Sequence, residues 1–151
     1  MKRNYTIFLF LLFLCCACKS NDKEPAGKSE NNVDAARNFI RAALDGKFRE
    51  ARSFMLQDSV NTNYMDVVER AYKNDKQSNK DGYRTSTIHF HKVDSINNST
   101  SVIIFSNSFM NNPDTLRIVK VNAQWLVDLK YLYEHDRDTL NNKMIINDSV
   151  K

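Results

Sequence analysis

The chain has 151 residues, with 22 Lys and Arg against 18 Asp and Glu, for a net charge of +4. No block of basic residues runs along it, which argues against nucleic acid as a partner. Glycine occurs only at positions 27, 46 and 82, and no G-x-S-x-G is present. The sequence thus excludes a glycine-rich phosphate loop and the nucleophile elbow of the hydrolases that carry this motif.

The first residues have the pattern of a targeting segment. Lys2 and Arg3 precede an almost unbroken apolar run over residues 5–14. This run has about half of the roughly twenty residues that a membrane-spanning helix needs. A basic start, a short apolar segment and then small residues predict a secretory signal peptide.

All three cysteines follow this run, at positions 15, 16 and 18. Their placement resembles the lipobox of bacterial lipoproteins, in which a cysteine is acylated and becomes the new N-terminus. Ala17 supplies the small residue before the cut, so we expect 1–17 to be the signal peptide and Cys18 the lipidated residue. Cys16 stays an alternative, because Cys15 stands where the lipobox prefers leucine. The other interpretations are an uncleaved anchor and a signal peptide that merely contains cysteines.

We expect a lipidated mature chain to be held in the cell envelope, at the outer membrane, by its acyl chains and without help from the folded domain. It would keep 20 of the basic residues, for a net charge of +2, and no other thiol, which excludes disulfides and cysteine chemistry. Residues 18–32 are polar and contain Pro25 and Gly27. They predict a flexible tether.

Three helices are expected next. Residues 33–44 carry apolar side chains at helical spacing, with Asn31 as the N-cap and Gly46 as the stop. A second helix follows with Phe48, Ala51 and Met55 on one side. The third is indicated by the series Tyr64, Val67, Val68, Ala71 and Tyr72, with Asn63 as its cap.

After the third helix the apolar period changes from 3.6 to 2, which predicts strands. Four segments rich in β-branched and aromatic residues are expected, at residues 83–95, 100–110, 115–122 and 125–133. The connections between them are short and rich in Asn, so neighbouring strands should be antiparallel.

This order of elements resembles the nuclear transport factor 2-like (cystatin-like) superfamily. The segments AARNFIRAALDGKFREARSFM and NAQWLVDLKYL are similar in particular to a domain-of-unknown-function family of bacterial lipoproteins within it. The resemblance implies an α+β domain over residues 33–133, with three N-terminal helices on a curved four-stranded antiparallel sheet in a cone shape. A C-terminal tail, 134–151, would follow. The superfamily contains isomerases, dehydratases, transport adaptors and domains without known activity, so function must come from the site.

Strand alternation assigns each side chain to one face of the sheet. The inward set is expected to be Ile88, Phe90, Ile103, Phe105, Phe109, Val119, Val121, Trp125, Val127 and Leu129. If the interior keeps a cavity for a small apolar ligand, its wall should include Tyr64, Tyr72, Phe90, Phe105 and Trp125. Alternatively these residues fill a solid core.

The outward face is expected to be apolar as well. The interface candidates are Val102, Ile104, Leu116, Ile118 and Leu126. Such a patch exceeds what a monomer usually exposes and predicts a homodimer or a protein partner. The cluster at 144–146 in the tail could shield it instead.

The sequence gives no set of catalytic or metal-binding residues. His89 and His91 are two apart on a strand, but a metal site needs three or four ligands, so exposed histidines are the expectation. Asp66, Glu69 and Asp128 are expected on surfaces, which argues against an enzyme with a carboxylate base inside the cone. No cofactor is expected.

The pattern Asp, then Ser or Thr, then a small or aliphatic residue occurs five times, against about 0.6 expected by chance from the composition. It is similar to an O-glycosylation motif of exported bacterial proteins. The acceptors would be Ser59, Ser95, Thr115, Thr139 and Ser149. Helix caps and turns could equally account for it.

These observations predict a cell-envelope lipoprotein whose domain binds a small apolar molecule or a protein without catalysis. A structural component that dimerises through its outer sheet face is the alternative, and an isomerase-like enzyme is a third.

Overall fold

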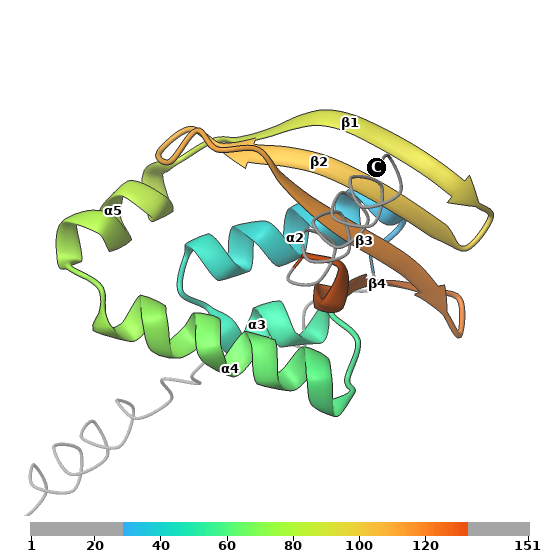
Figure 1. Ribbon diagram of the computed structural model, residues 1–151, viewed down its shortest axis with the longest axis horizontal. Helices are drawn as coiled ribbons and strands as arrows, with labels where there is room; N and C mark the ends of the chain where they lie inside the picture. The colour runs from blue at the N-terminus through green and yellow to red at the C-terminus, as the bar shows by residue number, and fades with distance from the viewer. Residues whose placement is uncertain (1–28, 133–151) are drawn as a thin grey trace, which may run out of the picture.

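The computed structural model describes residues 29–132, which form four helices, a four-stranded antiparallel sheet and a last helical turn at 129–132, where the sequence predicts the end of a strand (Figure 1). The helices are α2 (Asn32–Leu44), α3 (Phe48–Ser53), α4 (Ser59–Asn74) and α5 (Gln77–Thr85). The strands are β1 (Ile88–Asn97), β2 (Thr100–Asn107), β3 (Asp114–Val121) and β4 (Gln124–Asp128). The predicted α+β class and four-stranded antiparallel sheet are confirmed.

Several predictions concern segments outside the described residues. They are the signal peptide 1–17, lipidation at Cys18 or Cys16, and the tail 134–151. Within 29–132, no helix is long and apolar enough to cross a membrane.

Helix α2 begins and ends where the sequence predicts. The Asn31 side chain accepts a hydrogen bond from the Asp34 backbone N–H, which satisfies one free donor of the first turn. Gly46 takes a φ of 74°, the left-handed conformation that glycine adopts without strain. Ser29 is buried, so the end of the expected tether packs on the domain.

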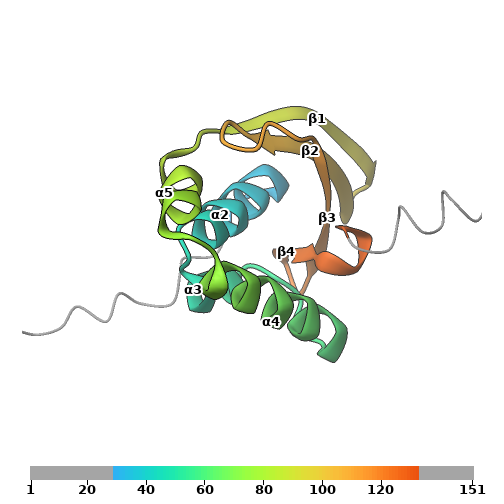
Figure 2. The ribbon, with the colours of Figure 1, turned by 60° about the vertical axis from the view of Figure 1, so that its left-hand side comes forward.

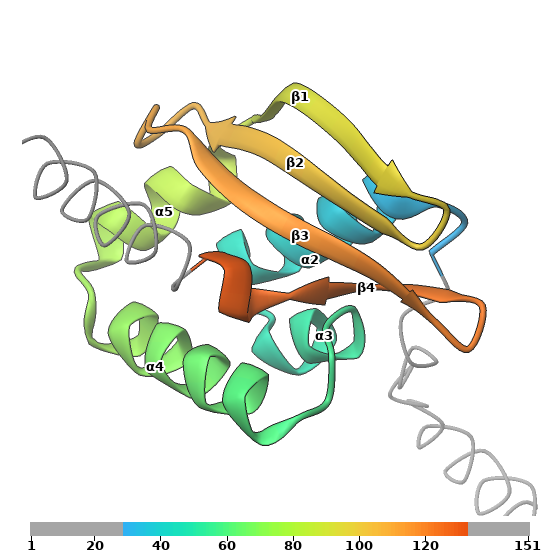
Figure 3. The ribbon, with the colours of Figure 1, turned by 45° about the vertical axis from the view of Figure 1, so that its right-hand side comes forward.

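The sheet has strand order β1-β2-β3-β4 and curves around α2 (Figures 2 and 3). Helix α2 lies against its inner face, where Asn32 Nδ2 donates to Ser101 Oγ at 2.6 Å. The chain after α3 pairs with β4, since Val127 N donates to Phe54 O and Leu56 N to Val127 O. This pairing covers part of the edge of the sheet that β4 would otherwise expose.

The core lies between α2, α3, α4 and the inner face of the sheet. Its largest fully buried apolar side chains are Met55, Met65, Ile103, Leu116, Ile118, Val127 and Leu129. Trp125 packs against this core from the inner face, as predicted. Fully burying one of these Val, Leu, Ile or Met side chains contributes about 1.5–3 kcal/mol to the stability of the fold.

The sequence analysis assigns the side chains of β3 to the wrong faces of the sheet. Ile103 pairs with Leu116, and Ser101 pairs with Ile118, so both β3 residues point inward, and they are 1% and 0% exposed. Val119 instead pairs with Leu126 on the outer face, and Val121 is exposed. Phe109, also expected inside, lies exposed after the end of β2.

The helical half also differs from its prediction. The described chain has four helices before the sheet, because residues 77–85, partly expected as strand, form α5. Helix α4 begins at Ser59, four residues before the expected cap Asn63. Its inner side is formed by Asn61 and Met65, whereas Val67 is 52% exposed.

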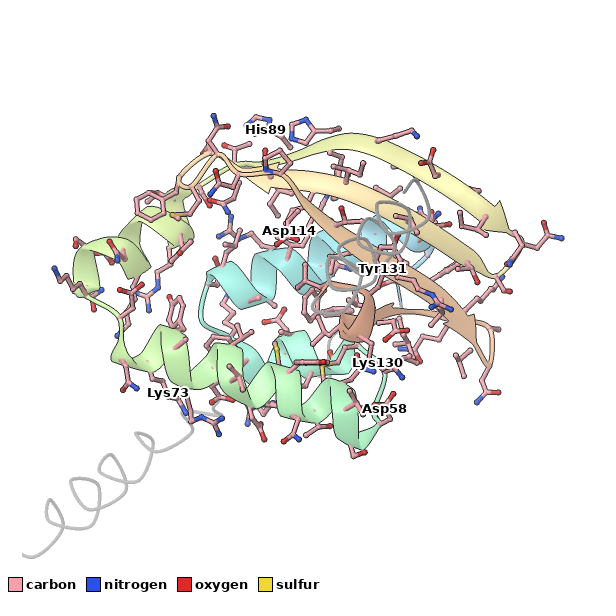
Figure 4. The ribbon with its side chains drawn as sticks, viewed as in Figure 1. Asp58, Lys73, His89, Asp114, Lys130 and Tyr131 are labelled. Atoms are coloured by element: carbon pink, nitrogen blue, oxygen red, sulfur yellow. The ribbon has the colours of Figure 1, made fainter. Side chains whose placement is uncertain are left out.

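A polar cluster joins the start of α4 to the end of β4. Asp58 caps α4 by accepting from the backbone N–H groups of Val60 and Asn61. The Lys130 ammonium lies 3.2 Å from the Asp58 carboxylate, and the two side chains lie beside each other in Figure 4. The backbone hydrogen bond from Asn61, supported by Lys130, lowers the pKa of Asp58 to about 2.

This lowered pKa predicts a specific acid dependence of stability. Because the folded-state pKa lies below the ordinary 3.8, the contribution of Asp58 is fully present above pH 3.8 and is lost as the pH falls towards 2. Asp58→Asn keeps an N-cap acceptor without an ionisable group, so we expect a shallower loss of stability between pH 4 and pH 2 than in the wild type. Urea midpoints measured across that interval test this, and parallel curves for the two proteins would contradict it.

Candidate ligand-binding site

A groove of about 700 Å³ lies between the C-terminal half of α2, the outer side of α4, and α5. Its lining is mainly aliphatic and aromatic: Ala43, Leu44, Val67, Val68, Ala71, Tyr72, Asn74, Asp75 and Tyr83. Val67 and Ala71 are exposed here, on a helix whose other face is in the core. The apolar stripe on α4 is thus wider than its core contact requires.

A second opening of about 320 Å³ reaches from the turn between β2 and β3 to the interior. Its floor consists of buried core residues, namely Phe39, Ile40, Met65, Leu116 and Leu129. Phe105, Met110 and Leu132 add apolar surface, and Asn107, Asn112 and Asp114 are the polar residues of its lining. We call this opening the inner cavity.

The groove and the inner cavity share a wall. Ala43, Leu44, Val68 and Tyr83 line both of them. The first three come from α2 and α4, which pack on the core, whereas Tyr83 comes from α5.

Helix α5 is attached mainly by polar contacts and aromatic rings, and none of its residues is buried. The Arg41 guanidinium donates to the carbonyl oxygens of Tyr83, Arg84 and Ser86 at 2.8–3.2 Å, and it also pairs with Asp45. Positive charge at these last carbonyls stabilises the C-terminal end of the helix.

A series of aromatic rings runs from α3 to the turn after β2. The ring centroids of Phe48 and Tyr72 are 5.3 Å apart, those of Tyr72 and Tyr83 are 6.5 Å apart, and those of Tyr83 and Phe109 are 5.0 Å apart. The Tyr72 hydroxyl is buried without a hydrogen-bond partner, which costs about 1–3 kcal/mol when nothing compensates. It lies against Gly46, where an added Cβ would come within 3.0 Å of it.

The predicted cavity wall is brought together only in part. Tyr72 lines the groove and Phe105 lines the inner cavity. Tyr64, Phe90 and Trp125 pack against the core and line neither opening. Phe90 instead has the Arg37 guanidinium 5.4 Å from its ring centroid, and Trp125 has the Lys120 ammonium at the same distance. Most of the lining lies outside the predicted wall, and Tyr83, which lines both openings, belongs to a segment that the sequence predicts as a strand.

The carboxylates considered as possible bases have structural partners. Asp66 and Glu69 both accept from Arg52 Nη2 at 2.7 Å. Hydrogen bonds from Lys73 and Arg52 lower the pKa of Glu69, which keeps it ionised. Asp128 points away from Trp125, as predicted. It is buried rather than on the surface, and its carboxylate contacts the Asn61 amide and the Arg117 guanidinium. It lines neither opening.

His89 and His91 are on β1, and His89 lies on the side of the sheet away from the helices (Figure 4). His91 Nε2 lies 2.8 Å from Ser106 Oγ. Residues 29–132 contain no group of three or more His, Cys, Asp or Glu side chains that could hold a metal ion.

Two of the five interface candidates, Leu116 and Ile118, are core residues and cannot contribute to an outer patch. Val102, Ile104 and Leu126 are half-buried on the outer face, and Arg117 is exposed among them. The apolar patch on the outer face is therefore smaller, and the face more polar, than the sequence predicts.

Three of the five glycosylation candidates fall within the described residues. Ser59 begins α4 and Ser95 lies near the end of β1, and both are exposed, whereas Thr115 is half-buried on β3. At Asp58 the capping hydrogen bonds account for the Asp of the pattern. Thr139 and Ser149 lie outside the described part of the chain.

Comparisons of the chain with protein-family models, with curated proteins and with solved structures give no match.

Proposed function

We propose that the chain is a bacterial lipoprotein, anchored through Cys18 in the outer membrane of the cell envelope, whose domain binds a small apolar molecule without chemical change. The proposal includes a cone-shaped fold of the nuclear transport factor 2-like kind. Its support is the element order and the curvature of the sheet around α2 (Figure 2). The anchor is supported by the N-terminal sequence alone.

The observation that carries the binding function is the inner cavity. Its floor is made of buried core side chains, and its few polar lining groups are Asn107, Asn112 and Asp114. Ligand sites are typically concave, mostly apolar, and supplied with few polar groups that fix orientation. A volume of about 320 Å³ suits a small molecule.

The second candidate, dimerisation through the outer sheet face, has less support. It now depends on Val102, Ile104 and Leu126, which are half-buried within a single chain.

The test is a titration with the neutral fluorescent probe N-phenyl-1-naphthylamine. We expect saturable binding with fluorescence enhancement, because the probe leaves water for an apolar cavity. Ala43→Trp should reduce the affinity at least tenfold, since Ala43 lies in the wall common to both openings. Val93→Trp is the matched control, because Val93 is exposed on β1, away from the cavity lining. Equal binding by both variants, or no saturable binding by the wild type, would contradict the proposal.

A further inference from the structure

Two exposed aliphatic side chains lie at one end of the sheet. Ile96 has the largest exposed fraction of the exposed large hydrophobic residues in 29–132, at 63%, and Val121 is 41% exposed. Ile96 lies just before the turn between β1 and β2, and Val121 just before the turn between β3 and β4. Lys120 N donates to Ser99 O at 2.8 Å, so the two turns lie side by side (Figure 3). We call these two turns, together with Ile96 and Val121, the turn face.

We infer that the turn face rests on the surface of the lipid bilayer, with Ile96 and Val121 in the head-group region. The inner cavity opens at the opposite end, at the turn between β2 and β3, where the exposed Met110 lines it. Its mouth therefore faces away from the membrane, and its ligand enters from the aqueous side. The inference rests on the proposed anchor at Cys18 and gives the anchored domain an orientation.

The first support is the place where the predicted tether joins the domain. Ser29 is buried, and its hydroxyl lies 3.4 Å from Asn38 Nδ2, so the described chain begins in contact with α2. Helix α2 begins beside the turn face, since Asn32 Nδ2 donates to Ser101 Oγ near the start of β2. Figure 3 shows the beginning of α2 and both turns on one side of the molecule, and the β2–β3 turn on the other.

The second support is the length of the tether. Ten residues, 19–28, separate Cys18 from Ser29. A flexible chain of this length has a root-mean-square span of about 18 Å, and fully extended it reaches at most about 40 Å. A domain the size of residues 29–132 is about 33 Å across. The turn face therefore meets the bilayer at the ordinary span of the tether, whereas the opposite end meets it only when the tether is almost fully stretched.

The third support is the chemistry of the turn face. Its turns, 97–99 and 122–123, consist of Asn, Ser and Ala, so no ionised group is desolvated when they enter the head-group region. The exposed Lys120 next to them supplies a cation for lipid phosphates. Two aliphatic side chains bind a bilayer only weakly, but an anchored domain is present at an effective concentration in the millimolar range, where weak contacts form.

Exposure alone does not choose between the two ends of the domain. Phe109 and Met110, at the opposite end, are 41% and 49% exposed. They lie on the side of the molecule away from the beginning of α2 (Figure 3). The place and the length of the tether therefore decide which apolar pair meets the membrane.

The orientation is tested on the full lipidated protein in phosphatidylcholine vesicles, with and without a phosphatidylcholine that carries a nitroxide on its head group. Asn98→Cys puts a thiol on the turn face, and Met110→Cys puts one at the mouth of the inner cavity. Each thiol is labelled with bimane, and the wild type taken through the same labelling gives the background. We expect the nitroxide to quench the label at position 98 at least threefold more strongly than the label at position 110. Equal quenching, or stronger quenching at position 110, would overturn the orientation.

The contact of Ile96 with lipid is tested by adding Ile96→Asp to the protein labelled at position 98. Ile96 is exposed in the domain, so the variant should stay folded, which circular dichroism confirms. We expect quenching to fall at least twofold, because a carboxylate resists transfer into the head-group region. Val67→Asp is the matched control, because Val67 is 52% exposed on α4, outside the turn face. Unchanged quenching with Ile96→Asp, or an equal loss with Val67→Asp, would overturn the contact.

Two measurements separate the orientation from the anchor itself. The intact mass of the purified protein reports its acyl chains, and flotation with the vesicles reports attachment. An acylated protein that floats but is quenched equally at positions 98 and 110 overturns the orientation alone. A protein without acyl chains that does not float overturns the proposed anchor, and the orientation with it.

Discussion

Ile118→Asp is expected to unfold the domain. Ile118 is 0% exposed, and it pairs with Val127 on one side and Ser101 on the other, on the face of the sheet that covers the helices. The substitution removes a buried aliphatic side chain and puts a carboxylate where water does not reach. The combined cost is on the order of 5 kcal/mol or more, comparable with the whole stability of a domain of this size.

Val119→Asp, one residue later, is the matched control. Val119 pairs with Leu126 on the outer face and is only half-buried, so the same change should cost about 1 kcal/mol and leave the protein folded. Soluble yield and far-ultraviolet circular dichroism distinguish the two variants, and a urea midpoint measures Val119→Asp. A folded Ile118→Asp protein together with an unfolded Val119→Asp protein would show that the register of β3 is the reverse of the one described.

The register of β3 shows why alternation alone could not assign the faces. In its sequence, DTLRIVKV, Leu116 and Ile118 belong to one face and Val119 and Val121 to the other, so both faces have two apolar residues. Only the pairing with β2 and β4 decides between them. That pairing also places Lys120 opposite Trp125, and the Lys120 ammonium lies over the indole ring. The charged residue of the strand is therefore on the same face as Trp125 and does not identify the outer face.

The fold was predictable from the sequence in larger part than the candidate site. The α+β class, the ends of α2 and the inward direction of Trp125 all followed from local signals in the sequence. Helix α5 did not, because QSNKDGYRT has no apolar stripe, and the helix depends on Arg41, which is more than thirty residues earlier in the chain. With α5 missing, neither the groove nor the place of Tyr83 in its lining could be anticipated.

Asn61→Ala is expected to destabilise the domain by about 2–4 kcal/mol, a large effect for a polar residue on a helix. Asn61 is 0% exposed, and its side-chain oxygen accepts the backbone N–H of Leu129 at 2.6 Å. Its amide nitrogen donates to Asp58 at 2.8 Å and reaches Asp128 at 3.4 Å. The alanine variant leaves a buried N–H without its acceptor and removes a donor from a buried carboxylate, and each loss costs about 1–3 kcal/mol.

The control for Asn61 is Asn63→Ala in the same helix. Asn63 is exposed two residues later, and the sequence suggested it as the cap of α4, a role that Asp58 fills in the structure. We expect Asn63→Ala to change the free energy of unfolding by less than about 0.5 kcal/mol. Urea denaturation of the two variants gives the comparison. Equal losses would mean that α4 begins near Asn63 and that the end of β4 is not held by Asn61, whereas a loss confined to Asn61→Ala ties the start of α4 to the strand that closes the core.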